Sequence, residues 1–151
     1  VNVIPAISTV KNGISWRQSV YYPLYFASLY GRGVSLQLKI NSPKYSSDIA
    51  DDVNYIDASA VINKEEKTLS FFLINRSEEE IVDLNFDLNN LQINKIIDQQ
   101  IINHPNIYAS NTSDKPNEIV PKKTNIVTFQ NDNLIAKIPK LSYLFILLKI
   151  K

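Results

Sequence analysis

The stretch Ser15–Ile40, SWRQSVYYPLYFASLYGRGVSLQLKI, contains a change of hydrophobic period that decides the fold. After Gly33, apolar and polar side chains alternate, which is typical of a half-buried strand. Before Gly33, apolar side chains recur at helical spacing. The positions that show the helical spacing are Trp16, Val20, Leu24 and Ala27. The stretch therefore predicts one helix followed by the first strand, Val34–Ile40, of a β-rich region.

The helix has its own start and stop signals. Ser15 is a preferred helix N-cap, and Gln18 stands three residues on, at the spacing of a capping box. Gly31 supplies a stop signal. We expect a helix over Ser15–Tyr30 with a bend at Pro23, because proline cannot donate an amide hydrogen inside a helix.

Seven further segments carry strand patterns separated by turn residues. They are Tyr55–Asn63, Thr68–Asn75, Ile81–Leu88, Ile93–Ile102, Asn125–Phe129, Leu134–Ile138 and Tyr143–Ile150. Short strands with hairpin-length connections predict an antiparallel β-sandwich of the jelly-roll or immunoglobulin-like kind. The connection Ser110–Lys123 is longer than usual, so we expect it to be functional or packed against something.

The beginning of the chain predicts a longer parent protein. Val1–Ile4 is apolar and reads as a short buried strand that ends at Pro5. The sequence contains no methionine, so we do not expect Val1 to be a natural start. We expect the chain to be a piece cut from a longer protein.

Composition argues against several classes of function. The chain carries 16 basic and 15 acidic residues, so it lacks the basic field that binds nucleic acid or anionic lipid. No apolar run reaches the roughly 18 residues of a membrane helix. Cysteine is absent and His104 is the single histidine, which disfavours a metal site or metal catalysis. We interpret His104 as a turn residue without an orienting partner, and we expect no cofactor.

Five sequence motifs resemble one family of enzymes. They are "VNVI", "WRQ" followed by "YYPLYFASLYGRGV", "SPKY", "NTSDKPNEIVP" and "IPKLSYLFIL". Their order and spacing resemble, over nearly the whole chain, the C-terminal end of the retaining α-L-arabinofuranosidases of glycoside hydrolase family fifty-one. Two departures stand out: "VNVIPAI" replaces the usual "VNVIAPI", and "KLSY" stands where the family commonly has "KLSW".

The resemblance implies a (β/α)8 catalytic barrel followed by a β-sandwich. Val1–Ile4 would be the last barrel strand and Ser15–Tyr30 the last barrel helix. Residues 1–32 would then be a remnant of the barrel, and residues 33–151 the C-terminal sandwich domain. The implied partner is the upstream barrel of the same chain. The resemblance also implies a homo-oligomeric parent protein, and we expect a cytoplasmic location.

The residues that catalysis needs are missing from this sequence. A retaining glycosidase uses two carboxyl groups about 5 to 5.5 Å apart. No aspartate or glutamate precedes Asp48, and the family places both catalytic glutamates on earlier barrel strands. We therefore assign no catalytic residue here and expect the chain alone to be inactive.

Two residues are candidate contacts for an arabinofuranosyl saccharide. The resemblance implies that Gln18 corresponds to a residue that hydrogen-bonds arabinose, and an amide offers both donors and an acceptor to sugar hydroxyls. The alternative is that Gln18 only completes the capping box of Ser15. Trp16 offers a flat apolar face for a sugar ring, or alternatively wedges the helix against the barrel.

Two other functions are alternatives to a part in an arabinofuranosidase. A free-standing carbohydrate-binding module would need exposed aromatic residues, yet no tryptophan follows Gly33. An immunoglobulin-like interaction domain would leave the leading strand and helix unexplained. Five of the eight tyrosines lie in or just after the predicted helix, where we expect burial against the barrel: Tyr21, Tyr22, Tyr25, Tyr30 and Tyr45.

Overall fold

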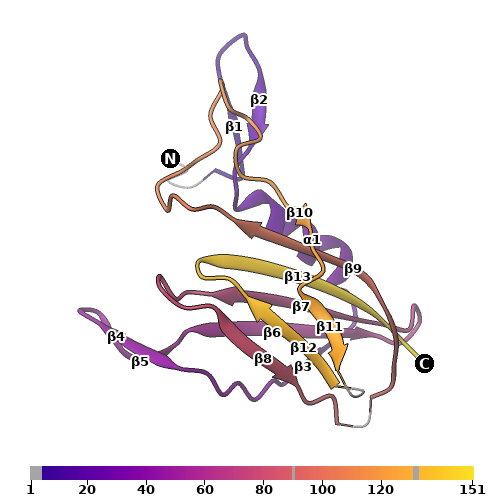
Figure 1. Ribbon diagram of the computed structural model, residues 1–151. Helices are drawn as coiled ribbons and strands as arrows, with labels where there is room; N and C mark the ends of the chain where they lie inside the picture. The colour runs from indigo at the N-terminus through magenta and orange to yellow at the C-terminus, as the bar shows by residue number, and fades with distance from the viewer. Residues whose placement is uncertain (1–4, 90, 131–132) are drawn as a thin grey trace.

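The structure is a computed structural model that describes residues 5–89, 91–130 and 133–151 (Figure 1). The expected strand Val1–Ile4 lies outside these ranges. Their regular elements are β1 (Ile7–Thr9), β2 (Ser15–Arg17), α1 (Tyr21–Tyr30), β3 (Val34–Leu36), β4 (Lys44–Ser47), β5 (Ala50–Asn54), β6 (Ile56–Asn63), β7 (Thr68–Asn75), β8 (Val82–Phe86), β9 (Ile93–Asn103), β10 (Lys122–Lys123), β11 (Val127–Gln130), β12 (Asn133–Ile138) and β13 (Ser142–Ile150).

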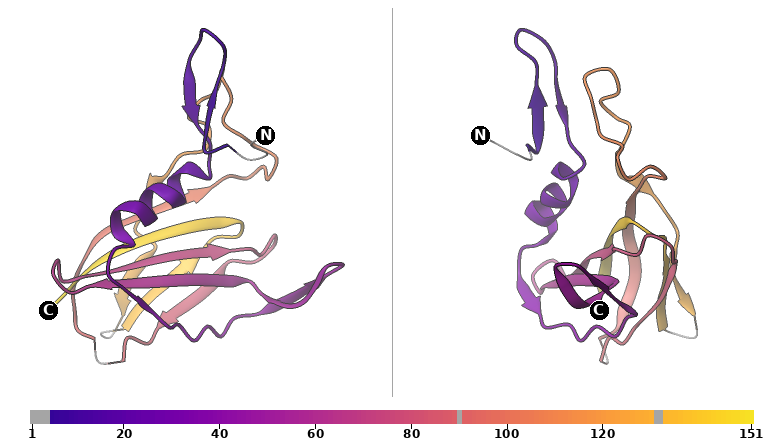
Figure 2. Two further views of the ribbon diagram at one scale, coloured as in Figure 1. Left: turned by 180° about the vertical axis from the view of Figure 1, so that it is seen from behind. Right: turned by 90° about the vertical axis from the view of Figure 1, so that its left-hand side faces the viewer.

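Two antiparallel sheets pack face to face and enclose the main core (Figure 2). The larger sheet has six strands in the order β10-β9-β13-β7-β6-β3, and the smaller has three in the order β11-β12-β8. Every pairing within them is antiparallel. This confirms the predicted mainly β class and the antiparallel sandwich.

Strand β13 is apolar on both faces because both faces are covered. Leu144, Ile146 and Leu148 join the core shared with the smaller sheet. Phe145 and Leu147 point the other way, into a second cluster with residues of α1. A strand buried on both sides reads as a continuous apolar run instead of an alternating one.

Helix α1 covers the outer face of the larger sheet. Tyr22 and Phe26 are buried there, and the Phe26 ring stacks on the Phe145 ring with 4.5 Å between centroids. Tyr22 therefore packs on the chain's own sheet, and the expectation that it is buried against a barrel is wrong. Tyr25, by contrast, remains 44% exposed.

The predicted start of the helix at Ser15 is wrong. Ser15–Arg17 forms β2, which pairs with β1 in an antiparallel hairpin, and α1 begins only at Tyr21. Asn12, at φ 57°, helps to make the turn of this hairpin. The pairing of β2 with β1 therefore prevails over the capping-box signal of Ser15 and Gln18. Pro23 falls in the first helical turn, where a missing amide hydrogen breaks no helical bond, so the reason for expecting a bend is removed.

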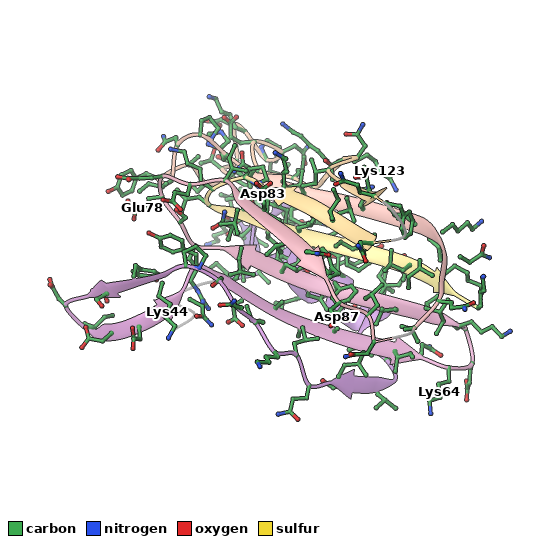
Figure 3. All side chains as sticks on the ribbon, turned by 60° about the horizontal axis from the view of Figure 1, so that its bottom comes forward. Lys44, Lys64, Glu78, Asp83, Asp87 and Lys123 are labelled. Carbon is green, nitrogen blue, oxygen red and sulfur yellow. The ribbon has the colours of Figure 1, made fainter. Side chains whose placement is uncertain are left out.

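A second hairpin, β4–β5, was not predicted. It projects from the sandwich (Figure 1), and its residues are mainly polar without alternation, so its sequence carries no strand signal. The ring of Tyr45 stacks on that of Tyr55 at its base. Charged side chains lie on separate elements at the edge of the molecule (Figure 3). Two examples are Lys44 on this hairpin and Lys64 between β6 and β7.

The other predicted strands agree with the structure apart from their ends. Thr68–Asn75 agrees at both ends, whereas the strand predicted over Val34–Ile40 stops at Leu36. The two-residue strand β10 was missed, and it takes the end of the predicted loop Ser110–Lys123. Among the described residues, no helix has the length and apolar character needed to cross a membrane.

Candidate functional site

The β1–β2 hairpin carries both predicted site residues. Trp16 lies in β2 and Gln18 follows it by two residues, so both side chains point to the same side of the extended chain. Each is half-buried. Arg17 points to the other side, and its guanidinium carbon lies 4.9 Å from the centre of the Tyr21 ring. The local structure therefore separates Arg17 from its two neighbours.

Trp16 and Gln18 converge on one backbone carbonyl of a distant loop. The indole Nε1 of Trp16 donates to the Asn111 carbonyl oxygen at 2.8 Å. The amide Nε2 of Gln18 donates to the same oxygen at 3.0 Å, and to Ser8 Oγ of β1 at 2.9 Å. The loop of residues 104–121 thus stands beside the hairpin (Figures 1 and 2). Of the two alternatives expected for Ser110–Lys123, a functional or a packed connection, these bonds favour packing.

The Asn111 side chain fastens that loop to the hairpin. It is 2% exposed. Its Nδ2 donates to the carbonyl oxygens of Arg17 at 2.8 Å and Ile119 at 2.9 Å. Its Oδ1 accepts from the Ile119 amide at 2.7 Å. Sequence reasoning missed Asn111, because no local signal links residues 93 to 95 positions apart.

The amide of Gln18 presents its acceptor, not its donors. A carbonyl oxygen can only accept, so the bond to Asn111 fixes which atom of the Gln18 amide is nitrogen. Both amide hydrogens are used, whereas no described residue donates to Gln18 Oε1. The N-cap of α1 is Val20, without a side-chain cap, so the alternative capping role of Gln18 is wrong.

His104 lies in the loop directly after β9, as expected, but it does have partners. Its Nδ1 accepts a hydrogen bond from the Asn106 amide at 3.1 Å, and its Nε2 lies 3.3 Å from Glu118 Oε1. The expectation that His104 lacks an orienting partner is therefore wrong. Among the described residues, no three histidine, cysteine, aspartate or glutamate side chains are grouped as a metal site would require.

A cavity of about 570 Å³ lies beside the start of α1. Val20, His104, Ile119 and Tyr143 are among the residues that line it. The Tyr143 hydroxyl is buried, without a hydrogen-bond partner among the described residues, and burial raises the pKa of Tyr143.

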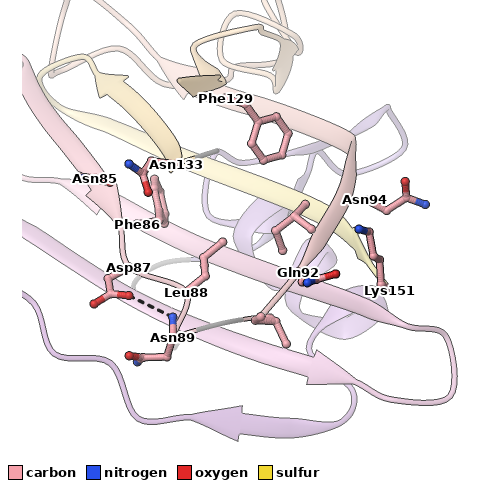
Figure 4. A pocket seen from close by; sticks show the side chains of 12 residues that line it. Asn85, Phe86, Asp87, Leu88, Asn89, Gln92, Asn94, Phe129, Asn133 and Lys151 are labelled. Carbon is pink, nitrogen blue, oxygen red and sulfur yellow. Dashed lines mark hydrogen bonds between the residues drawn. The ribbon is translucent and has the colours of Figure 1, made fainter. Parts of the chain in front are cut away.

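A larger cavity, of about 930 Å³, is lined by residues at the ends of β8, β9, β11 and β12 (Figure 4). Its wall combines aromatic rings with amides, among them Phe86, Phe129, Asn85, Gln92, Asn94 and Asn133. The backbone amide of Asn89 donates to Asp87 Oδ1 at 3.0 Å on one side of the cavity (Figure 4). None of the predicted site residues lines this cavity.

Comparison with known proteins identifies the family. Residues 1–142 match the family model described as "Alpha-L-arabinofuranosidase C-terminal domain". The chain therefore belongs to the α-L-arabinofuranosidase C-terminal domain family, and the resemblance seen in the sequence is confirmed.

Individual relatives agree with this assignment. "Intracellular exo-alpha-(1->5)-L-arabinofuranosidase 1" of Bacillus subtilis is 37% identical over 99% of this chain, which spans 29% of that protein. A Halalkalibacterium halodurans enzyme with the same name apart from the final numeral is 34% identical over 95% of the chain, which spans 28% of it. The chain thus spans less than a third of the length of these relatives.

Solved structures show the same fold. A family 51 α-L-arabinofuranosidase from Bifidobacterium longum superposes with a TM-score of 0.87 at 27% identity, covering 97% of this chain and 28% of that one. An arabinose complex of the Thermotoga maritima enzyme gives a TM-score of 0.76 at 18% identity, covering 94% of this chain and 31% of that one, which shows likeness of fold alone.

Proposed function

We propose that this chain is the C-terminal segment of a retaining α-L-arabinofuranosidase. The whole enzyme releases terminal arabinofuranosyl residues from arabinan- or arabinoxylan-type saccharides, is cytoplasmic, and forms homo-oligomers. The observation that carries the proposal is the acceptor Oε1 of Gln18, which has no donor among the described residues and stands beside Trp16 on an anchored hairpin in a chain of this family. In this proposal Gln18 hydrogen-bonds the arabinose, and Trp16 forms part of the pocket wall.

The chain divides, in this proposal, into a barrel remnant at residues 1–32 and a sandwich domain at residues 33–151. The β1–β2 hairpin pairs with neither sheet of the sandwich, which supports the division. The barrel would supply both catalytic carboxyl groups. The hairpin would stand at the catalytic face, because the loops that follow barrel strands build active sites there.

An apolar surface of α1 supports docking of the upstream barrel. Val20, Leu24, Tyr25 and Leu29 are between 36% and 59% exposed although they are large and apolar. Large apolar side chains exposed together on one helix are typical of an interaction site. We propose that the barrel covers this surface in the longer enzyme.

The isolated chain should therefore self-associate at high concentration, because the apolar surface of α1 lacks its partner. Sedimentation velocity should show species larger than the monomer, and Leu24→Lys together with Leu29→Lys should shift them towards monomer. Ile49→Lys is the matched control, since Ile49 is 95% exposed but lies between β4 and β5. A clean monomer at high concentration would count against a docking surface on α1.

The activity should appear only when the upstream region is present. We expect the 151-residue chain to leave an aryl arabinofuranoside intact, because it lacks the paired carboxyl groups. The chain extended to the full length of its relatives should hydrolyse this substrate with retention of anomeric configuration. Hydrolysis by the 151-residue chain would contradict the assignment of both catalytic carboxyl groups to the upstream barrel. An inactive longer chain would refute the proposed activity.

A second candidate function is a non-catalytic carbohydrate-binding module. The cavity in Figure 4 favours it, because amides and aromatic rings are the groups that bind sugar hydroxyls and sugar faces. Phe129, which is 45% exposed, is the natural platform. Retention of the short chain by soluble arabinoxylan in affinity electrophoresis, abolished by Phe129→Ala, would favour this function over the first.

A further inference from the structure

The loop of residues 104–121 belongs to the sandwich, yet it holds the hairpin that carries Gln18. We infer that Asn111 is a positioning residue of the sugar pocket, which sets the orientation of Gln18 and makes its amide a hydrogen-bond acceptor for a sugar hydroxyl. This inference rests on the proposed function of Gln18. It assigns a part of the binding site to the sandwich domain.

The Asn111 side chain is first of all hydrogen-bonded to the hairpin. Arg17 lies between Trp16 and Gln18, and the Arg17 carbonyl accepts from Asn111 Nδ2 at 2.8 Å. This bond fixes the backbone at the point from which both neighbouring side chains project. Because Asn111 is 2% exposed, water cannot readily replace the bond.

The second step is the pair of hydrogen bonds by which the Asn111 side chain holds its own loop. Asn111 exchanges two hydrogen bonds with Ile119, of 2.7 and 2.9 Å, and so closes the loop eight residues further on. Three of the four hydrogen-bonding positions of this side-chain amide are therefore occupied, including both donors. Such a satisfied buried amide holds the hairpin and the loop in one arrangement.

The third step is the chemistry that this arrangement leaves to Gln18. The Asn111 carbonyl takes one hydrogen of the Gln18 amide at 3.0 Å, and Ser8 Oγ takes the other at 2.9 Å. Only Oε1 is left to bind a ligand, so the amide accepts from a hydroxyl and does not donate to a ring oxygen. A glutamine released from Asn111 would rotate freely and lose this selectivity.

The spectroscopic test uses the 151-residue chain, in which Trp16 is the single tryptophan. Asn111→Ala should shift the fluorescence emission of Trp16 to longer wavelength and increase its quenching by iodide, because the backbone carbonyl that accepts from the indole is no longer held in place by the Asn111 side chain. Asn106→Ala is the matched control: its Oδ1 accepts from the Tyr108 amide at 2.9 Å in the same loop. Unchanged emission in Asn111→Ala would overturn the inference.

The kinetic test uses the longer enzyme, with circular dichroism as a check on folding. Asn111→Ala should lower kcat/KM on an aryl arabinofuranoside about tenfold, since a displacement of about 1 Å can cost up to about 100-fold. Asn111→Asp should not restore it, because a carboxylate cannot donate to the Arg17 and Ile119 carbonyls. In a Gln18→Ala background, Asn111→Ala should have little further effect, since the Asn111 side chain acts on the sugar contact only through the position of Gln18.

Ser8→Ala provides a variant that leaves buried Asn111 intact. It removes the second anchor of Gln18, so kcat/KM should fall while the thermal midpoint stays the same. If the losses of kcat/KM in Gln18→Ala and Asn111→Ala multiplied in the double variant, the positioning role of Asn111 would be overturned while the sugar contact of Gln18 would stand. No effect of Gln18→Ala would overturn the proposed sugar contact, and this inference with it.

Discussion

Replacing Gln18 with alanine in the longer enzyme is expected to lower kcat/KM on an aryl arabinofuranoside more than tenfold, or about 1.4 kcal/mol or above. The variant loses the acceptor Oε1, which the proposed function assigns to a sugar hydroxyl. The position of Oε1 depends on the bonds that the Gln18 amide makes to Ser8 and to the Asn111 carbonyl. A neighbouring side chain cannot easily supply an acceptor at the same point. Initial rates over a range of substrate concentrations measure the loss.

Folding and function are separated by two controls. The thermal midpoint of Gln18→Ala should stay close to that of the unmodified enzyme, since Gln18 is only half-buried and caps no helix. Gln37→Ala, at an exposed position just after β3, should leave kcat/KM unchanged. An unaltered kcat/KM in Gln18→Ala would reduce Gln18 to a structural link between hairpin and loop.

Replacing Phe145 with alanine should destabilise the 151-residue chain by about 3 to 5 kcal/mol, the usual cost of deleting a buried phenylalanine ring. Phe145 is 0% exposed at the centre of the larger sheet. Its ring packs against those of Phe26, Tyr30 and Phe72, with 4.5, 5.0 and 5.6 Å between centroids. The loss should appear as a lower midpoint in urea unfolding.

The size of this effect reports whether α1 is part of the folded sandwich. A loss of about 3 to 5 kcal/mol is a large share of the 5 to 15 kcal/mol typical of a domain. Tyr108→Ala removes an aromatic ring that is 87% exposed, so the free energy of unfolding should change by less than about 0.5 kcal/mol. Similar midpoints for Phe145→Ala and Tyr108→Ala would show that the helix does not pack on the sheet in solution.

Apolar runs and alternating patterns bounded by turn residues were sufficient to predict most of the sandwich. Thr68–Asn75 and Tyr143–Ile150 were predicted within one residue, because their apolar side chains face covered surfaces of the sheet. The β4–β5 hairpin was missed because it projects from the core, so burial does not select its residues. The identity of Gln18 and Trp16 as candidates came from a resemblance to a family, and their sugar contacts remain predictions.

The sequence by itself determined the mainly β class, the positions of the buried strands and the absence of any carboxylate side chain before Asp48, since each follows from residue type and local period. Only the tertiary structure decided that Ser15–Arg17 is a strand and that Asn111 meets Trp16 and Gln18. Local capping signals are worth about 1 kcal/mol. Strand pairing and a buried hydrogen-bond network across more than 90 residues outweigh them, and no local pattern records such partners.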